Sequence, residues 1–120
     1  MKKENPIADK SYSFALRAIK LYKHLCDDKK EFVLSKQVLR SGTAIGALVK
    51  EAEHAQSTAD FINKMNIALK EANETEYWLR LLKDSDYISQ KSFDSIYPEI
   101  IELIKILASI VKTSRDKLKI

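Results

Sequence analysis

The sequence predicts an all-α fold, an antiparallel up-down-up-down four-helix bundle that forms a single domain over residues 1–120. Apolar residues recur every three or four positions through four successive segments, which is the spacing of helices that bury one face. Glycine and proline each occur only twice, too seldom for the many turns of a sheet protein. A chain of 120 residues has the usual size of one domain with one core.

The first helix is expected at residues 7–25, directly after Pro6. The polar run at residues 27–30 then offers a place where the chain can reverse. The apolar stripe of this helix has the spacing of a bundle seam and consists of Ile7, Phe14, Ala18, Leu21 and Leu25.

The second and third helices are expected at residues 32–54 and 58–83, each with a stripe whose members alternate four and three residues apart. Ser57 or Thr58 is expected to cap the third helix, because a hydroxyl there accepts an unpaired backbone N–H, and Asp60 suits the positive end of the helix dipole. The stripe of the second helix is Leu34, Val38, Ser41, Ile45, Leu48, Ala52 and Ala55. The stripe of the third helix is Phe61, Met65, Ala68, Ala72, Thr75, Leu79 and Leu82.

The fourth helix is expected at residues 89–114, after a turn at residues 84–86. Pro98 conflicts with this helix, because it removes one hydrogen bond and its ring clashes with the carbonyl of Asp94. We therefore expect a kink at Pro98 or a short turn there before the main helix begins, and fraying over residues 112–120. The seam of the fourth helix is Phe93, Ile96, Ile100, Leu103, Leu107 and Ile110. A second stripe widens the apolar face and consists of Tyr97, Ile101, Ile104, Ala108 and Val111.

Two glycines, Gly42 and Gly46, lie one turn apart on the second helix and interrupt its pattern. A glycine inside a helix is less favourable than alanine by about 0.8–1.0 kcal/mol. We expect the close approach of another backbone to compensate, either that of the third helix or that of a second subunit. Simple tolerance of the two glycines is the alternative.

Two aromatic residues of the third helix are candidates for packing between helices or subunits. Trp78 flanks the apolar stripe and is expected to cover the edge of the core, whereas Tyr77 falls on the opposite side and faces away from the bundle. Outward aromatic residues are enriched at subunit interfaces, although a solitary surface tyrosine is equally compatible. Structural ion pairs along the boundary of the second and third helices are expected for Arg40, Glu51, Glu74 and Glu76.

The formal net charge is +4 with an isoelectric point near 9.1, which favours an anionic partner such as RNA or DNA. Basic residues occur on the outer side of the first helix and in the C-terminal segment, and simple antiparallel packing would bring the two groups together into one patch. Lysines at a helix C-terminus also suit its dipole, which is the alternative explanation. The candidate phosphate contacts are Lys10, Arg17, Lys20, Lys23, Lys112, Arg115, Lys117 and Lys119.

The sequence patterns do not favour an enzyme. Glu51 and His54 form one Glu-x-x-His, whereas a di-iron bundle needs this motif twice together with two further glutamates, so no metal or cofactor is expected. Arg17 and His24 have an Arg-x6-His spacing that looks like the loose motif of the all-helical HEPN ribonucleases, in which Arg and His act on RNA. The sequence contains no Gly-rich phosphate loop, nucleophile elbow or zinc-ligand spacing.

The single cysteine, Cys26, excludes a disulfide within one chain. The N-terminal residues lack the apolar segment of a signal peptide. No apolar run approaches the roughly 20 residues of a membrane span. We therefore expect a cytoplasmic protein without a membrane partner.

Five segments carry a resemblance to a known family. They are Phe14-Ala15 with Leu21-Tyr22-Lys23, residues 37–47 (QVLRSGTAIGA), Asp60-Phe61-Ile62, residues 67–72 (IALKEA) and residues 74–79 (ETEYWL). Together they resemble the four-helix bundle family encoded in 23S rRNA intervening sequences, which is similar to the accessory variability determinants of diversity-generating retroelements. The resemblance covers nearly the whole chain, although the fourth helix contributes only its hydrophobicity. Ala44 and Leu48 stand where the family commonly has serine and asparagine, so this segment is expected to serve packing alone.

The resemblance implies a homopentameric, barrel-like assembly of bundles. Members carried by retroelements bind nucleic acid and a reverse transcriptase through basic surfaces, while no activity is established for most other members. The expected function is therefore that of a non-enzymatic, oligomeric bundle that binds RNA or DNA as an accessory or scaffold protein. The alternatives are a purely structural or protein-binding oligomer and a HEPN-like ribonuclease.

Overall fold

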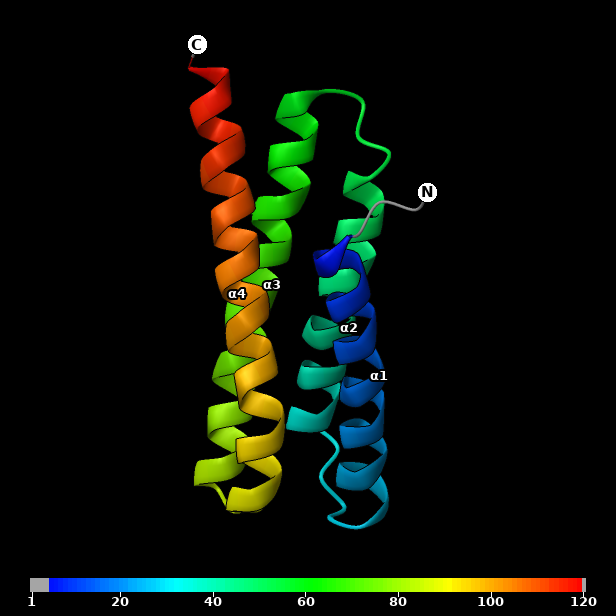
Figure 1. The fold of residues 1–120 in the computed structure, drawn as a ribbon. Helices are drawn as coiled ribbons and strands as arrows, with labels where there is room; N and C mark the ends of the chain where they lie inside the picture. Colours follow the sequence, from blue (N-terminus) through cyan, green and yellow to red (C-terminus); the bar gives the residue numbers. More distant parts are fainter. Residues whose placement is uncertain (1–4, 120) are drawn as a thin grey trace.

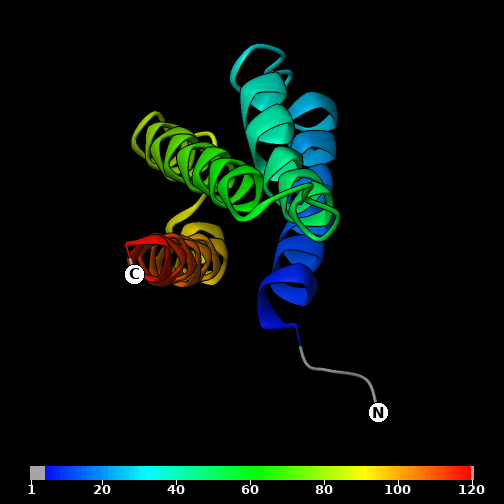
Figure 2. The same cartoon turned by 90° about the horizontal axis from the view of Figure 1, so that it is seen from above.

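The computed structural model describes residues 5–119, which form four α-helices and no strand (Figure 1). Their bounds are α1 (Pro6–Asp27), α2 (Leu34–Ala52), α3 (Thr58–Asp84) and α4 (Gln90–Leu118). Successive helices run in opposite directions, and the molecule extends 51 × 28 × 23 Å. Helix α2 packs between α1 and α3, and α4 packs on α3, while α1 and α4 form the smallest helix–helix contact (Figure 2). The expected all-α, four-helix architecture is confirmed.

A continuous core runs between the helices and is built from the predicted stripes. Ile45, Leu79 and Ile100 are completely buried, with exposed fractions of 0%. Several stripe positions are only partly buried, and at two of them the next residue is buried instead, Val49 after Leu48 and Ile62 after Phe61. A strict three-four alternation drifts against the 3.6-residue turn of an α-helix, so a neighbouring residue rotates into the core.

Side-chain caps define three of the helix starts. Pro6 is the first residue of α1, and the Asn5 side chain accepts the backbone N–H of Ala8 at 3.3 Å. Ser57 caps α3 by accepting the N–H of Asp60 at 3.0 Å, which confirms the predicted cap. Ser89 caps α4 by accepting the N–H of Ser92 at 3.1 Å.

The predicted bounds of the second helix are too wide at both ends, because α2 spans Leu34–Ala52. At its start, the Glu31 carboxylate accepts the N–H groups of Val33 and Ser35 at 3.2 and 2.7 Å. This carboxylate accepts backbone N–H groups at the start of α2, a role that the side chain of the N-cap residue usually has. The N-cap residue here, Val33, has no polar side chain for it. Phe32 therefore lies in the preceding loop and is half exposed.

The predicted short turn at Pro98 is wrong, because α4 continues through this residue as one helix and extends to Leu118 (Figure 1). Pro98 and Asp94 are both exposed. The Asp94 carbonyl, which loses its helical donor at Pro98, can therefore bond to water. The predicted fraying from residue 112 is also wrong for the described part of the tail, which remains helical.

Both glycines of α2 face α1, so the close approach within the chain comes from the first helix and not from the third, while contact with a second subunit stays a prediction. A Cβ atom added to Gly42 would lie 2.9 Å from the Cβ of Ala18, and one added to Gly46 would lie 3.4 Å from the backbone oxygen of Ser11. The small residues thus let the backbones of α1 and α2 come close together. At Gly42 a third helix also comes near, with Thr75 of α3 at 3.9 Å from the added Cβ.

Candidate nucleic-acid interface

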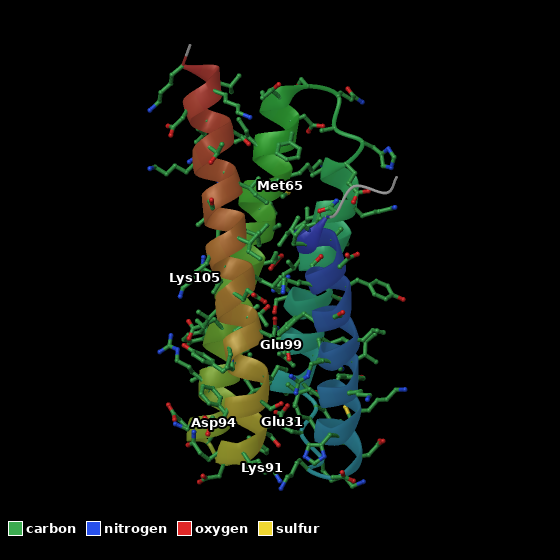
Figure 3. The ribbon with its side chains drawn as sticks, viewed as in Figure 1. Glu31, Met65, Lys91, Asp94, Glu99 and Lys105 are labelled. Atoms are coloured by element: carbon green, nitrogen blue, oxygen red, sulfur yellow. The ribbon has the colours of Figure 1, made fainter. Side chains whose placement is uncertain are left out.

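Four basic side chains follow one another along the outer side of α4. Lys105, Lys112 and Lys119 are spaced seven residues apart, and Arg115 lies between the last two. Seven residues are close to two helical turns, so the three lysines share a face about 21 Å long. All four residues are exposed, and Lys105 points away from the bundle (Figure 3). We call Lys105, Lys112, Arg115 and Lys119 the α4 basic stripe.

The charges of the α4 basic stripe are not neutralised by neighbours. None of its members forms an ion pair within residues 5–119, and Asp116 is the only acidic residue of α4 beyond Glu102. The exposed residues Ala108 and Ser109 lie between the lysines and are small, so a polyanion can approach the helix surface closely. Such an arrangement of mobile cations suits phosphate groups.

Lys117 is exposed but lies on a different side of α4 from the stripe, since it is two residues from Lys119 and successive helical residues turn by about 100°. Lys105 was not among the residues chosen from the sequence. The seven-residue repeat of lysines at 105, 112 and 119 is the sequence signal that would have identified it.

Two of the basic residues expected on the first helix serve the contact between α1 and α4. The Lys10 ammonium lies 3.1 Å from the Glu102 carboxylate. The Arg17 guanidinium is paired with the Glu99 carboxylate, and it also donates to the backbone oxygen and the hydroxyl of Ser95 at 3.0 and 2.9 Å. Figure 3 shows Glu99 on the side of α4 that faces α1. These cations hold the two outer helices together.

The expected single patch from helix 1 and the C-terminal segment is not formed. Helix α1 runs antiparallel to α4, so exposed Lys20 and Lys23 lie towards the end of the molecule where α4 begins (Figure 1). Lys112 and Lys119 lie at the opposite end. The basic residues therefore form separate groups.

Arg17 and His24, the pair that looks like a ribonuclease motif, line a common cleft between α1 and α4. His24 Nδ1 lies 2.8 Å from the Asp28 carboxylate, which orients the imidazole ring. The Glu51 and His54 motif is not on one helical face, because α2 ends at Ala52 and His54 lies in the following turn. Within residues 5–119, no group of three or more His, Cys, Asp or Glu side chains could hold a metal ion.

The predicted ion pairs between the second and third helices are found for Arg40, Glu51 and Glu74. Arg40 bridges Glu71 and Glu74 at 3.1 and 3.2 Å, and Glu51 lies 3.4 Å from Lys64. Burial raises the pKa of the Glu71 carboxyl above its usual value, with a further rise from its hydrogen bond to Glu74, while Arg40 opposes the shift.

Glu76 does not belong to the boundary of α2 and α3, which corrects the prediction. It lies two residues after Glu74 and therefore on another side of α3. Its carboxylate accepts hydrogen bonds from Arg80 at 2.5 Å and from the Tyr97 hydroxyl of α4 at 2.8 Å. The pKa of the Tyr97 hydroxyl is raised, mainly by the hydrogen bond to Glu76 and to a smaller extent by burial.

Tyr77 and Trp78 lie side by side on the outer part of α3. Tyr77 is 48% exposed, as expected for an outward residue, and its ring meets that of Trp78 edge to face with a centroid distance of 5.2 Å. Trp78 packs against the core. Its Nε1 is buried and has no hydrogen-bond partner within residues 5–119.

An apolar groove between α1 and α2 was not recognised in the sequence. It has a volume of about 500 Å³ and is lined by Tyr12, Ala15, Gly46 and Ala47, among others. Tyr12 and neighbouring Leu16 are 67% and 50% exposed. The four-residue spacing of two large apolar side chains outside the main stripe is the signal that would have revealed this face.

No helix within residues 5–119 combines the length and the apolar character needed to span a bilayer.

Comparison with known proteins places the fold among related chains. The family described as 23S rRNA-intervening sequence protein matches residues 3–109. A crystal structure of a protein of unknown function from the S23 ribosomal protein family of Bacteroides thetaiotaomicron is 59% identical, with a TM-score of 0.88, over 90% of this chain and 96% of that chain. No curated protein matches the sequence. Three members of the α4 basic stripe lie beyond the family match, which ends at residue 109.

Proposed function

This chain belongs to the 23S rRNA-intervening sequence protein family, and we propose that it is a non-enzymatic, self-associating bundle that binds RNA or DNA through basic surface. The observation that carries the nucleic-acid part is the α4 basic stripe, whose cations are exposed and free of ion pairs within residues 5–119. The proposal places the protein in the cytoplasm and assigns it an accessory or scaffold role.

Binding at the stripe would be driven by the release of counterions from phosphates. Each phosphate contact contributes about −0.9 to the slope of log affinity against log salt for duplex DNA, and about −0.7 for a single strand. Four cations along one helix face would therefore give a slope of about −3 to −4. Arg115 is the one member of the α4 basic stripe whose side chain can donate two parallel hydrogen bonds to a base edge. We therefore expect little sequence preference.

The self-association part is supported by the apolar groove between α1 and α2. Tyr12 and Leu16 are large apolar side chains in water, and aromatic residues are enriched at protein interfaces. Tyr77 on α3 offers a second outward aromatic contact. The family resemblance implies a homopentamer. Such an assembly would use both surfaces if the groove between α1 and α2 of one subunit packs against α3 of the next.

The nucleic-acid proposal is tested by removing charge from the stripe. We expect the triple variant Lys105→Gln, Lys112→Gln and Lys119→Gln to bind a fluorescent single-stranded RNA about tenfold or more weakly at low salt. Anisotropy titrations across salt concentration should show the slope reduced by about 2, or about 0.7 for each lost contact.

A control variant carries the same change in net charge at exposed lysines elsewhere, Lys29→Gln, Lys36→Gln and Lys70→Gln. It should retain the slope of the unmodified protein. Equal losses in both triple variants would show that only net charge matters and would contradict an interface on α4. A protein that assembles but does not bind RNA or DNA at low salt would instead support the purely structural oligomer.

The ribonuclease alternative has one observation in its favour, the common cleft of Arg17 and His24. Incubation with labelled RNA distinguishes it. Cleavage that disappears in His24→Ala would replace the non-enzymatic proposal, whereas intact RNA would support it.

A further inference from the structure

The cleft that contains Arg17 and His24 gathers polar groups from both outer helices. It has a volume of about 240 Å³ and lies between α1 and the start of α4. Its lining residues are Arg17, Lys20, Leu21, His24, Ile88, Ser92 and Ile96. The cleft lies at the start of α4, whereas Lys112 and Lys119 lie near its end, so the cleft is separate from the α4 basic stripe.

Three nitrogen-bearing side chains of α1 enter this cleft from one helix face, because they follow one another at three and four residues. Lys20 forms no ion pair within the described chain, residues 5–119, so its ammonium is available to a ligand. Arg17 uses three of its five N–H groups on Ser95 and Glu99, which leaves two donors. The Asp28 carboxylate holds Nδ1 of His24 and leaves Nε2 unengaged.

The α4 side adds a hydroxyl and a helix N-terminus. Ser92 lies in the first turn of α4, and its oxygen accepts the hydroxyl hydrogen of Ser89 at 3.1 Å. The hydroxyl hydrogen of Ser92 therefore remains available to an acceptor in the cleft. The N-terminus of this 29-residue helix carries a partial positive charge, which favours an anion nearby.

The remaining walls are apolar. Ile88 and Ile96 are buried, and Leu21 is partly buried. Apolar walls lower the local dielectric constant and strengthen a hydrogen bond between charged partners. Two carboxylates border the cleft, those of Glu99 and Asp28, but each is engaged by a cation or an imidazole.

We propose that this cleft binds a phosphate group, held by the Lys20 ammonium and the remaining donors of Arg17 and Ser92. The volume has room for several water molecules at about 30 Å³ each and therefore for one tetrahedral oxyanion. The phosphate belongs either to a small anion or to the end of a nucleic-acid strand, since both present the same acceptor oxygens. The inference does not depend on the α4 basic stripe.

Backbone amide NMR spectra of the full chain, titrated with inorganic phosphate at constant ionic strength, test the cleft directly. We expect saturable shifts confined to residues 17–24 and 88–96. In Lys20→Ala the dissociation constant should rise about tenfold, as expected for the loss of one charge-assisted hydrogen bond of about 1.5 kcal/mol.

Lys23→Ala is the matched control, because Lys23 is an exposed lysine of the same helix that does not line the cleft. Its affinity for phosphate should be unchanged. The proposal would be overturned if phosphate shifted the amide signals near all lysines, or if the shifts did not saturate. Equal losses of phosphate affinity in Lys20→Ala and Lys23→Ala would overturn it as well.

A second arm identifies the source of the phosphate by comparing RNA oligonucleotides with a 5′-phosphate and a 5′-hydroxyl. Tighter binding of the phosphorylated strand that is lost in Lys20→Ala assigns the cleft to strand ends. Binding of inorganic phosphate without this difference assigns it to a small anion. The triple variant of the α4 basic stripe should leave the phosphate shifts intact, so failure of either proposal is distinguishable from failure of the other.

Discussion

At the scale of single residues, close contacts between α1 and α2 determine which side chains the fold accepts. Gly42 is buried where a Cβ atom would come within 2.9 Å of Ala18, a contact too short for two carbon atoms. The neighbour is itself a Cβ on a helix backbone and has no flexible side chain that could move aside. Gly46 has slightly more room, with the nearest atom at 3.4 Å.

We predict that Gly42→Ala lowers the free energy of unfolding by about 1–2 kcal/mol. Overpacking by one methyl group costs about 1–3 kcal/mol, which exceeds the gain in helix propensity. Chemical denaturation monitored by circular dichroism measures the change. Gly46→Ala is the matched control and should change stability by less than about 1 kcal/mol in either direction. A Gly42→Ala protein as stable as the unmodified one would show that α1 and α2 can separate freely.

Tyr97 gives a prediction for alkaline pH. Its hydrogen bond to Glu76 raises the pKa of the hydroxyl in the folded state above that in the unfolded chain. The stability from this bond is therefore fully present below pH 10 and is lost as the pH rises through the folded-state pKa.

The variant Tyr97→Phe should lose part of the stability at neutral pH and show a weaker decline above pH 10 than the unmodified protein. Thermal unfolding between pH 7 and 11 measures both effects. Tyr87→Phe is a control, because the structure gives its hydroxyl no side-chain partner within residues 5–119. Parallel stability curves for Tyr97→Phe and the unmodified protein would contradict the role of the bond.

At the scale of elements, α4 carries a proline without breaking. Pro98 stands nine residues into a 29-residue helix, and its exposed position lets water satisfy the carbonyl that loses a donor. The buried residues Ile96 and Ile100 on either side keep the helix on the core. Tertiary packing therefore outweighs the local conflict.

Replacing Pro98 by alanine should stabilise the protein by about 1–3 kcal/mol, because it restores one backbone hydrogen bond and removes the ring clash. Urea denaturation measures the gain, and hydrogen exchange should show slower exchange at residues 94–102. Ala108→Gly, at another exposed position of α4, should have the opposite sign, with a loss of up to about 1 kcal/mol. A destabilised Pro98→Ala would mean that the proline ring itself makes a needed contact.

At the scale of the whole molecule, the four helices leave two different outer surfaces. The face of α1 and α2 is apolar around Tyr12 and Leu16, whereas the far end of α4 is basic. The proposed self-association and the proposed binding of a nucleic acid would therefore use separate surfaces. Lys10 and Arg17 of α1 form ion pairs with Glu102 and Glu99 across the small contact between α1 and α4.

We predict that Tyr12→Ser with Leu16→Glu reduces the solution mass to that of a monomer, because the new charge would be buried unpaired at the proposed subunit contact. Analytical ultracentrifugation measures the mass. Phe32→Ser, which removes an exposed apolar side chain from the loop before α2, should leave assembly unchanged. An unaltered mass in the double variant would place the subunit contact elsewhere.

The sequence by itself determined the helices, most of their buried stripes and the Ser57 cap, because helix periodicity and capping depend on residues within one or two turns of each other. Three of the four members of the α4 basic stripe, Lys112, Arg115 and Lys119, were also among the residues predicted from the sequence. Only the tertiary structure decided that Gly42 faces α1, that Glu76 meets Tyr97, and that Arg17 is bound by residues 78 and 82 positions away. Such contacts depend on the rotation and register of one helix against another, and these are set by the packing of all four helices together.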